Sequence, residues 1–217
     1  MIKNTKLILL DLDGVIIDSK KNMQMSWNKV RKVFKLKVPF NSYFKHIGLP
    51  FETILKRLYI KKNLNKISKT YQNESIRHFN KIKLYPGVAK TLKDLIKRKI
   101  KLGIVTSKDK DRTLKLIKKF KINIKLIVSP SKGLRGKPYP DQLLKAMKML
   151  KTNSSNTIYV GDMLVDYRAA KNSGINFIHS RYGYGKKKFF INTPSNNLKI
   201  YLKLFKFKKN FKYISVL

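Results

Sequence analysis

The sequence predicts an α/β fold, in which helices cover both faces of a parallel sheet and a helical segment is inserted after the first strand. Short apolar runs with the character of buried strands alternate with segments of helical periodicity, which is typical of a parallel sheet with crossover helices. Residues 19–85 break this alternation, since they contain several helical patterns and no strong strand. Pro86 and Gly87 then mark the return to the sheet.

Five apolar runs are expected to form the strands, and three amphipathic segments between them are expected to form helices. The predicted strands are Lys6–Leu10, Lys101–Val105, Leu126–Val128, Thr157–Val160 and Asn176–His179. The predicted helices are Val88–Lys99, Asp111–Phe120 and Pro140–Leu150, with apolar faces that include Ile96, Leu114 and Leu144.

The segment 19–85 is expected to form a helical domain, inserted into a sheet domain made of residues 1–18 and 86–217. Ser19 is a suitable N-cap for a helix that carries Trp27 and Val33 on its apolar face. Two further helices are predicted over Phe51–Ile60 and Ile67–Phe79.

The C-terminal region begins with Thr193 and Pro194, a good pair for the start of a helix that continues through Phe205. Lys206–Leu217 then alternates basic and aromatic residues. An extra edge strand or a packed tail is the favoured interpretation of this tail, with a nucleic-acid contact or a membrane-surface segment as alternatives.

The composition excludes several classes of site and leaves the meaning of the charge open. The 217 residues include no cysteine, which excludes disulfides, cysteine-bound metals and thiol nucleophiles. No stretch approaches the ~18 apolar residues of a membrane span, and the N-terminus lacks the apolar core of a signal peptide, so we expect a soluble, cytoplasmic protein. The net charge of +40 reflects either a lysine-rich genomic bias, which we favour, or a surface selected for polyanions.

The scarce acidic residues are concentrated in two places. Of the 11 in the chain, five lie in the short windows Asp11–Ser19 and Gly161–Asp166. They are Asp11, Asp13, Asp18, Asp162 and Asp166. Like charges repel one another, so a bound metal cation is the expected compensation.

Four short segments with chemically capable side chains follow predicted strands or begin helices at one edge of the sheet, where open α/β sheets bind ligands. They contain Asp11 and Asp13, Thr106 and Ser107, Lys137, and Asp162 with Asp166. Such a set suits phosphoryl transfer, because one carboxylate can attack phosphorus and a second can protonate the leaving oxygen. A hydroxyl and a lysine can hold the phosphoryl oxygens, while further carboxylates hold Mg²⁺.

The stretches DLDGVIIDS, YPGVAKTLKDL, GIVTSKD, GKPYPD, YVGDMLVDYRAAKNSG and RYGYG resemble motifs of the haloacid dehalogenase-like superfamily. The resemblance extends from Ile8 to about Tyr184 and is strongest to the phosphoglycolate phosphatase-like branch with a helical cap. It implies a Rossmann-like parallel sheet core with an inserted helical cap domain, which residues 19–85 would form.

The resemblance also implies a role for each motif position. Asp11 would be the nucleophile and Asp13 the general acid/base; a carboxyl at position 13 favours phosphatases over dehalogenases, because an alkoxide leaving group needs a proton and a halide does not. Thr106, with Ser107 beside it, and Lys137 would bind the substrate phosphate. The Mg²⁺ ligands would be Asp11, Asp13 through its backbone carbonyl, Asp162 and Asp166, the last as a ligand or as an acid supporting the ligands.

The inserted segment would close over the substrate and set specificity, as caps of this family do. Lys45, Lys56 and Arg57 could reach an anionic group of the substrate, although a solvated helix face is the favoured interpretation of each. No arginine directly follows the loop Ile47–Pro50, which disfavours a phosphomutase.

The function indicated is a Mg²⁺-dependent phosphatase that hydrolyses a small phosphomonoester, a phosphorylated metabolite, through an aspartyl-phosphate intermediate. The alternatives are a phosphatase acting on nucleotides or nucleic-acid ends, a phosphomutase, and a non-catalytic polyanion-binding module. The sequence alone leaves the substrate and the oligomeric state open.

Overall fold

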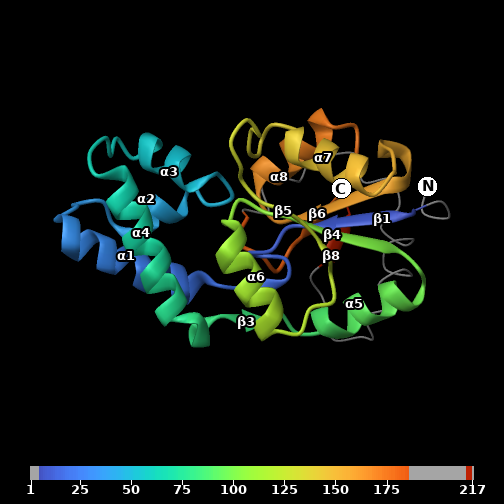
Figure 1. The fold of residues 1–217 in the computed structure, drawn as a ribbon, viewed down its shortest axis with the longest axis horizontal. Coiled ribbons are helices and arrows are strands. Elements are labelled where there is room, and N and C mark those ends of the chain that lie inside the picture. Colours follow the sequence, from blue (N-terminus) through green and yellow to red (C-terminus); the bar gives the residue numbers. More distant parts are fainter. Residues whose placement is uncertain (1–4, 186–213, 217) are drawn as a thin grey trace.

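A six-stranded sheet forms the centre of the molecule (Figure 1). The computed structural model describes residues 5–185 and 214–216. The strand order is β5-β4-β1-β6-β7-β8, and the first five strands in this order are parallel. The strands are β1 Leu7–Leu10, β4 Lys101–Val105, β5 Leu126–Val128, β6 Thr157–Gly161, β7 Asn176–Ser180 and β8 Ile214–Val216. The predicted α/β class and all five predicted parallel strands are therefore confirmed.

Two pairs of helices cover the sheet, one pair on each face (Figure 1). Helices α5 (Val88–Lys97) and α6 (Lys110–Lys119) lie on one side, and α7 (Asp141–Met149) and α8 (Leu164–Asn172) lie on the other. Strand β1 supplies apolar side chains to both layers, since Ile8 and Leu10 belong to one buried cluster and Leu7 and Leu9 to the other. Such burial on both faces explains why the strands read as continuous apolar runs.

Three residues expected on the buried helix faces are partly exposed instead. Ile96, Leu114 and Leu144 have exposed fractions of 36%, 44% and 47%. In α6 the buried positions are taken by Thr113 and Leu116, which turns Leu114 away from the sheet. Neighbouring residues of a helix point about 100° apart, so an apolar run cannot bury every member.

The inserted segment contains four helices that pack around their own apolar cluster (Figure 1). They are α1 Lys20–Phe34, α2 Phe40–Phe44, α3 Phe51–Arg57 and α4 Leu64–Arg77, followed by a short 3-10 turn, Phe79–Lys81. Trp27 is fully buried, stacks on Tyr43 at 4.5 Å between ring centroids, and donates its Nε1 hydrogen to the Val38 carbonyl. Val33, expected beside Trp27, is half exposed because it lies in the last turn of α1.

A two-stranded antiparallel ribbon joins the inserted segment to the sheet. It pairs β2 (Ile17–Asp18) with β3 (Lys83–Leu84), so the chain enters and leaves the insert side by side. Ser19 precedes α1 as expected, but its hydroxyl makes no capping hydrogen bond and instead donates to Asp13. The prediction of a capping side chain is wrong here, because the Ser19 hydroxyl is oriented towards the Asp13 carboxylate and accepts from no backbone N–H of the first turn of α1.

The described part of the C-terminal region agrees with the favoured interpretation. Strand β8 pairs antiparallel with β7 at the edge of the sheet, which confirms an extra edge strand within Lys206–Leu217. The helix predicted from Thr193 through Phe205 lies outside the described residues. Among residues 5–185 and 214–216, no helix is both long and apolar enough to cross a membrane.

Candidate active site

The carboxyl ends of three neighbouring strands bring the predicted residues together. Asp11 follows β1, Thr106 follows β4 and Asp162 follows β6. Because β1 lies between β4 and β6 in the sheet, residues far apart in the sequence meet at one edge. This is the edge at which open α/β sheets bind their ligands.

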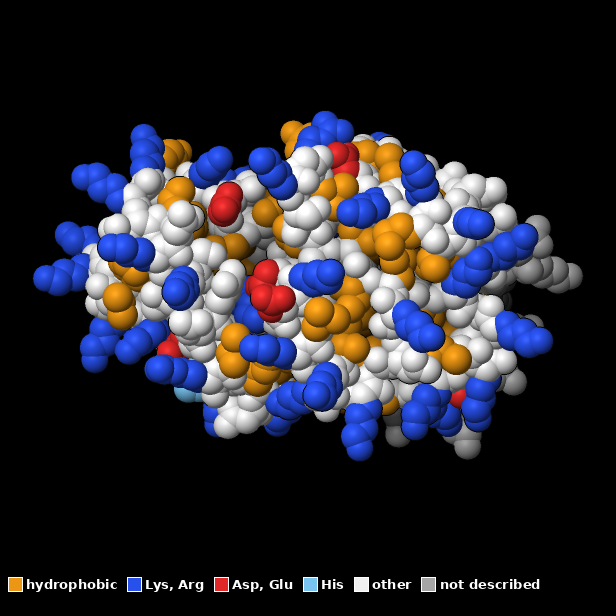
Figure 2. All heavy atoms as spheres, in the orientation of Figure 1, with side chains coloured by type: hydrophobic (Ala, Val, Ile, Leu, Met, Phe, Trp, Pro, Cys, Tyr) orange, Lys and Arg blue, Asp and Glu red, His pale blue; other side chains and the backbone are white. Residues whose placement is uncertain are grey.

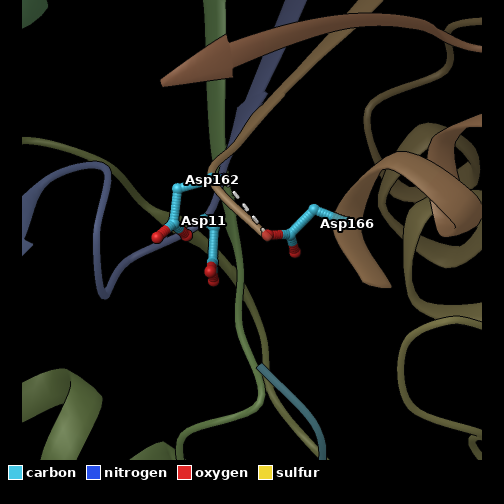
Figure 3. A group of neighbouring side chains, drawn as sticks. All are labelled: Asp11, Asp162 and Asp166. Atoms are coloured by element: carbon cyan, nitrogen blue, oxygen red, sulfur yellow. Dashed lines mark hydrogen bonds between the residues drawn. The ribbon is translucent and has the colours of Figure 1, made fainter. Parts of the chain in front are cut away.

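Three buried carboxylates converge at this edge (Figure 3). Asp11, Asp162 and Asp166 each offer an oxygen, and these oxygens all lie within 4.8 Å of one another. All three side chains are nearly or completely buried. Burial raises the pKa of Asp11 to about 7, although Lys137 opposes the rise, and burial together with the neighbouring carboxylates raises the pKa of Asp162 well above its usual range. The cluster therefore favours either protons or a cation.

Lys137 supplies one positive charge to this cluster. Its ammonium lies 3.0 Å from Asp11 Oδ1 and 2.6 Å from Asp166 Oδ1, and it donates to the Tyr159 hydroxyl at 3.1 Å. Burial would lower the pKa of Lys137, but Asp11 and Asp166 outweigh it and raise the pKa above its usual value. One ammonium against three carboxylates leaves negative charge that a divalent cation could balance.

Asp166 uses both of its oxygens to hold its neighbours in place. Oδ1 accepts from Lys137 and from the Tyr159 hydroxyl, at 2.6 and 3.0 Å. Oδ2 accepts from the backbone N–H groups of Asp162 and Met163, at 3.2 and 2.9 Å. Of the two roles expected for Asp166, this arrangement favours an acid that supports the ligands.

Asp162 has the opposite character, because one of its oxygens remains available. Oδ2 accepts from the Tyr184 N–H at 2.6 Å, whereas Oδ1 is buried with no hydrogen-bond partner among the described residues. Two glycines enclose this side chain, since a Cβ at Gly14 or Gly183 would lie 2.2 or 2.4 Å from its nearest atom, and a Cβ at Gly185 would lie 1.7 Å from the backbone carbonyl oxygen of Asp162. A buried, unpartnered carboxylate oxygen beside Asp11 fits a hard divalent cation, whose preferred ligands are oxygens.

Asp13 has partners outside this cluster, one just before α1 and one after β4. One oxygen accepts from the Ser19 hydroxyl, and the other lies 3.1 Å from the Lys108 ammonium. Lys108 is almost fully buried; burial lowers its pKa, and Asp13 opposes that effect. Sequence reasoning gave no role to Lys108, although it directly follows Thr106 and Ser107 in one of the quoted motifs.

A cavity of about 60 Å³ lies between the sheet edge and the inserted helices. Ser107 bridges the two sides, because its hydroxyl donates to the Gly48 carbonyl at 2.6 Å. This contact favours a positioning role for Ser107 over direct contact with phosphate. The lining residues are Asp11, Asp13, Thr106, Ser107, Lys108 and Arg112 from the sheet side, and Met23, Tyr43, Ile47, Gly48, Leu49, Phe51, Ile54 and Tyr71 from the insert, with Met163.

The cations in this lining come from the sheet side rather than from the insert. They are Lys108 and Arg112, whereas the candidates Lys45, Lys56 and Arg57 do not line the cavity. The sequence signal for Arg112 is weak, because it lies inside a helix that is rich in exposed lysine.

The chain is similar to a known family, to characterised proteins and to solved structures. A family model described as haloacid dehalogenase-like hydrolase matches residues 8–180. A pyrophosphatase, PpaX, of Halalkalibacterium halodurans is 30% identical over 172 residues, which cover 77% of this chain and 80% of that protein. A phosphoglycolate phosphatase of Aquifex aeolicus is 27% identical over 207 residues, covering 90% and 96% of the two chains. The crystal structure of a haloacid dehalogenase-like hydrolase from Bacteroides fragilis has the same fold, with a TM-score of 0.80, 24% identity, and coverage of 88% of this chain and 95% of that one.

Proposed function

We propose that this chain, which belongs to the haloacid dehalogenase-like hydrolase family, is a Mg²⁺-dependent phosphatase that hydrolyses a small phosphomonoester through an aspartyl phosphate. The phosphatase class is indicated by its relatives, which are named as phosphoglycolate phosphatase and pyrophosphatase. One observation carries the proposal: the buried Asp11 carboxylate lines the cavity, with the Lys137 ammonium at 3.0 Å and the Asp162 carboxylate beside it.

In the first half of the reaction, Asp11 is the nucleophile. One of its carboxylate oxygens forms a bond to phosphorus while the bond from phosphorus to the leaving oxygen breaks. The Asp13 carboxyl gives its proton to that leaving oxygen, so the alcohol departs neutral. The Thr106 hydroxyl and the Lys137 ammonium are suited to hold the phosphoryl oxygens, since both groups are buried at the same edge of the sheet.

In the second half, the oxygen of a water molecule attacks phosphorus, and the Asp13 carboxylate takes a proton from that water molecule. The bond between phosphorus and the Asp11 oxygen then breaks, which releases inorganic phosphate and restores both carboxyl groups. Ser19 and Lys108 hold the Asp13 carboxylate in place for both proton transfers.

The metal would be held by Asp11, Asp162 and the backbone carbonyl of Asp13, with Asp166 orienting the other groups. Mg²⁺ would supply positive charge against the phosphoryl oxygens and offset the carboxylate cluster. The assignment rests on the buried, unpartnered Oδ1 of Asp162 and on an all-oxygen donor set.

The placement of Asp11 favours a small phosphorylated metabolite over a nucleic-acid end. Asp11 is buried in a cavity of about 60 Å³ between the sheet edge and the inserted helices, and this cavity shares Phe51, Ser107 and Arg112 with a wider neighbouring cavity of about 440 Å³. Figure 2 shows lysine and arginine side chains spread over the visible face and not gathered in one patch, so this face has no basic track for a nucleic acid. The cytoplasmic location expected from the sequence stays a prediction.

Phosphate release from a panel of two phosphomonoesters and one phosphoanhydride tests the proposal. The panel contains p-nitrophenyl phosphate, 2-phosphoglycolate and pyrophosphate, each assayed with Mg²⁺ and with a chelator. We expect turnover that requires Mg²⁺ and falls at least about 10³-fold in Asp11→Asn, since the nucleophile is lost. Asp94→Asn, an exposed change on α5, is the matched control and should retain wild-type turnover. An inert wild-type protein, or an Asp11→Asn variant as fast as wild type, would contradict the proposal.

A further inference from the structure

Arg112 is a buried cation in the wall of the cavity. Its side chain extends from the first turn of α6, and the residue is 6% exposed. Asp109 fixes its orientation, because that carboxylate accepts from the Arg112 backbone N–H at 3.0 Å and from Nε at 2.5 Å. A guanidinium has five N–H groups, so this pairing leaves the four on its terminal nitrogens for other acceptors.

The positive charge of Arg112 faces the cavity, whereas its counter-charge lies outside it. Asp109 does not line the cavity that contains Asp11; its side chain is 32% exposed and lines a neighbouring cavity that Arg112 also borders. The other two cations at the site are balanced from within: Lys108 by Asp13, and Lys137 by Asp11 and Asp166. Among the described residues that line the cavity, Arg112 is therefore the cation whose ion-pair partner is not part of the lining.

Two hydroxyls of the inserted segment complete this wall. Tyr43 and Tyr71 are buried, both line the cavity, and the Tyr43 hydroxyl donates to the Tyr71 oxygen at 2.9 Å. Tyr71 thus retains its own proton for another acceptor. The Arg112 guanidinium carbon lies 5.3 Å from the centroid of the Tyr71 ring, so the guanidinium and the Tyr71 hydroxyl are neighbouring donors, and Tyr43 holds that hydroxyl in place.

The remaining surface around these donors is apolar. Phe51, Ile54, Leu49 and Met23 line the same side of the cavity. A guanidinium loses hydration in such surroundings, which is costly unless an anion takes the place of water. Donors of this strength and geometry match a carboxylate or a phosphate.

We propose that Arg112, with Tyr71, binds a second anionic group of the substrate, so that the enzyme prefers small phosphorylated compounds whose leaving group carries a carboxylate or phosphate. This inference rests on the proposed function, because it needs the phosphoryl group to sit at Asp11. Arg112 and Asp11 line the same small cavity, which places the second anion within a few bonds of the phosphorus.

The preference is tested by comparing substrates that differ in the second group. The probes are 2-phosphoglycolate, which supplies a carboxylate, pyrophosphate, which supplies a phosphate, and ethyl phosphate, which supplies neither. We expect wild-type kcat/KM to be at least ~10-fold higher for one or both anionic probes than for ethyl phosphate, since hydrogen bonds to charged groups are worth about 1.5–3 kcal/mol. The anionic probe with the larger increase in kcat/KM over ethyl phosphate identifies the second group as a carboxylate or a phosphate.

Variants of Arg112 separate recognition from stability. Arg112→Gln should lose about 10–100-fold in kcat/KM for the anionic probes, mainly through KM, and stay within about twofold of wild type for ethyl phosphate. Arg112→Lys should keep part of the preference, because the charge remains without the planar fork. Asp109→Asn breaks the same ion pair but leaves the guanidinium, so it should keep the preference. Arg77→Gln, with a side chain 72% exposed on α4, is the matched control.

Three results would overturn the inference. The first is equal wild-type efficiency on all three probes, and the second is an equal fall on all three in Arg112→Gln. If the wild-type protein hydrolyses no probe, the proposed function fails, and binding decides the inference on its own. Phosphonoacetate, which carries both anionic groups, should then bind wild type at least ~10-fold more tightly than Arg112→Gln, whereas ethylphosphonate should not distinguish them; equal binding of phosphonoacetate is the third overturning result.

Discussion

Replacing Lys137 with methionine would remove the ammonium that balances the buried carboxylates. Methionine keeps the length and apolar stem of lysine, so the change is mainly electrostatic. The ammonium contacts Asp11 at 3.0 Å, Asp166 at 2.6 Å and the Tyr159 hydroxyl at 3.1 Å, and its side chain is 0% exposed. Without it, three carboxylates remain within 4.8 Å of one another, and no other lysine or arginine in the described part of the chain forms an ion pair with them.

The expected loss of stability is large because the pair is fully buried. Removing one partner of a buried ion pair costs about 3–5 kcal/mol, since the other charge is left unpaired. Protonation of the carboxyls limits this loss: burial already raises the pKa of Asp11 to about 7 beside Lys137. A raised carboxyl pKa means that the folded variant binds more protons than its unfolded chain, so its stability falls as the pH rises. The deficit should therefore be larger at pH 8 than at pH 5.

Urea unfolding of the metal-free protein measures this loss, with a chelator present and with spectroscopic detection at both pH values. Lys145→Met, an exposed change on α7, is the matched control and should remain within about 0.5 kcal/mol of wild type. Adding Mg²⁺ should recover part of the lost stability, because a ligand that binds only the folded state stabilises it. A Lys137→Met protein within ~1 kcal/mol of wild type at pH 8 would refute the idea that this ammonium balances the buried carboxylates.

Three further changes test other contacts. Ser107→Ala removes the hydrogen bond to the Gly48 carbonyl, which is worth about 0.5–1.5 kcal/mol, and should raise KM a few-fold with little change in kcat. A 100-fold fall in kcat would instead indicate that this hydroxyl contacts the phosphoryl group. Gly185→Ala drives a Cβ to 1.7 Å from the Asp162 carbonyl oxygen, so kcat/KM should fall at least ~10-fold and stability by about 1–3 kcal/mol in urea unfolding. Asp109→Asn keeps a side chain that can cap the N-terminus of α6 but loses the ion pair with Arg112. In the wild-type protein burial raises the pKa of Asp109, but Arg112 outweighs burial, so the pKa is lowered. The wild-type advantage, about 0.5–1 kcal/mol at pH 7 in urea unfolding, should vanish as the pH falls through that lowered pKa.

Each of these changes has an outcome that would show the reasoning to be wrong. For Gly185, the comparison is Gly133→Ala, whose Cβ meets no atom within 4 Å. Its φ of +75° strains an alanine, so this variant should lose stability but keep its activity, and equal activity losses in the two variants would remove the steric argument. For Asp109, an advantage that persists unchanged at pH 2 would mean that the ion pair is not its source.

The sequence predicted the sheet and the meeting place of the catalytic candidates for a simple physical reason. Strands buried on both faces must be apolar throughout, so all five parallel strands could be predicted from apolar runs in the sequence. Side chains that follow parallel strands necessarily meet at one edge, so Asp11, Thr106 and Asp162 could be grouped before their distances were known.

The buried faces of the helices and the contacts of Asp166 depended on side-chain directions that the sequence pattern does not encode. The apolar periodicity of α6 and α7 did not distinguish the buried Leu116 and Leu143 from the exposed Leu114 and Leu144, because helix rotation is set by packing against the sheet. The four hydrogen bonds accepted by Asp166 became visible only once β6, α8 and the Lys137 loop were placed together.

By itself the sequence determined the order of strands and helices and the edge at which the carboxylates gather, since both follow from local burial patterns and chain direction. Only the tertiary structure decided what surrounds the substrate. Arg112 and Lys108 face the cavity, and Lys45, Lys56 and Arg57 do not line it, because the inserted helices close over the turn after β4. The cavity lies where the sheet edge meets the inserted helices, and no local pattern in either part of the chain encodes that contact.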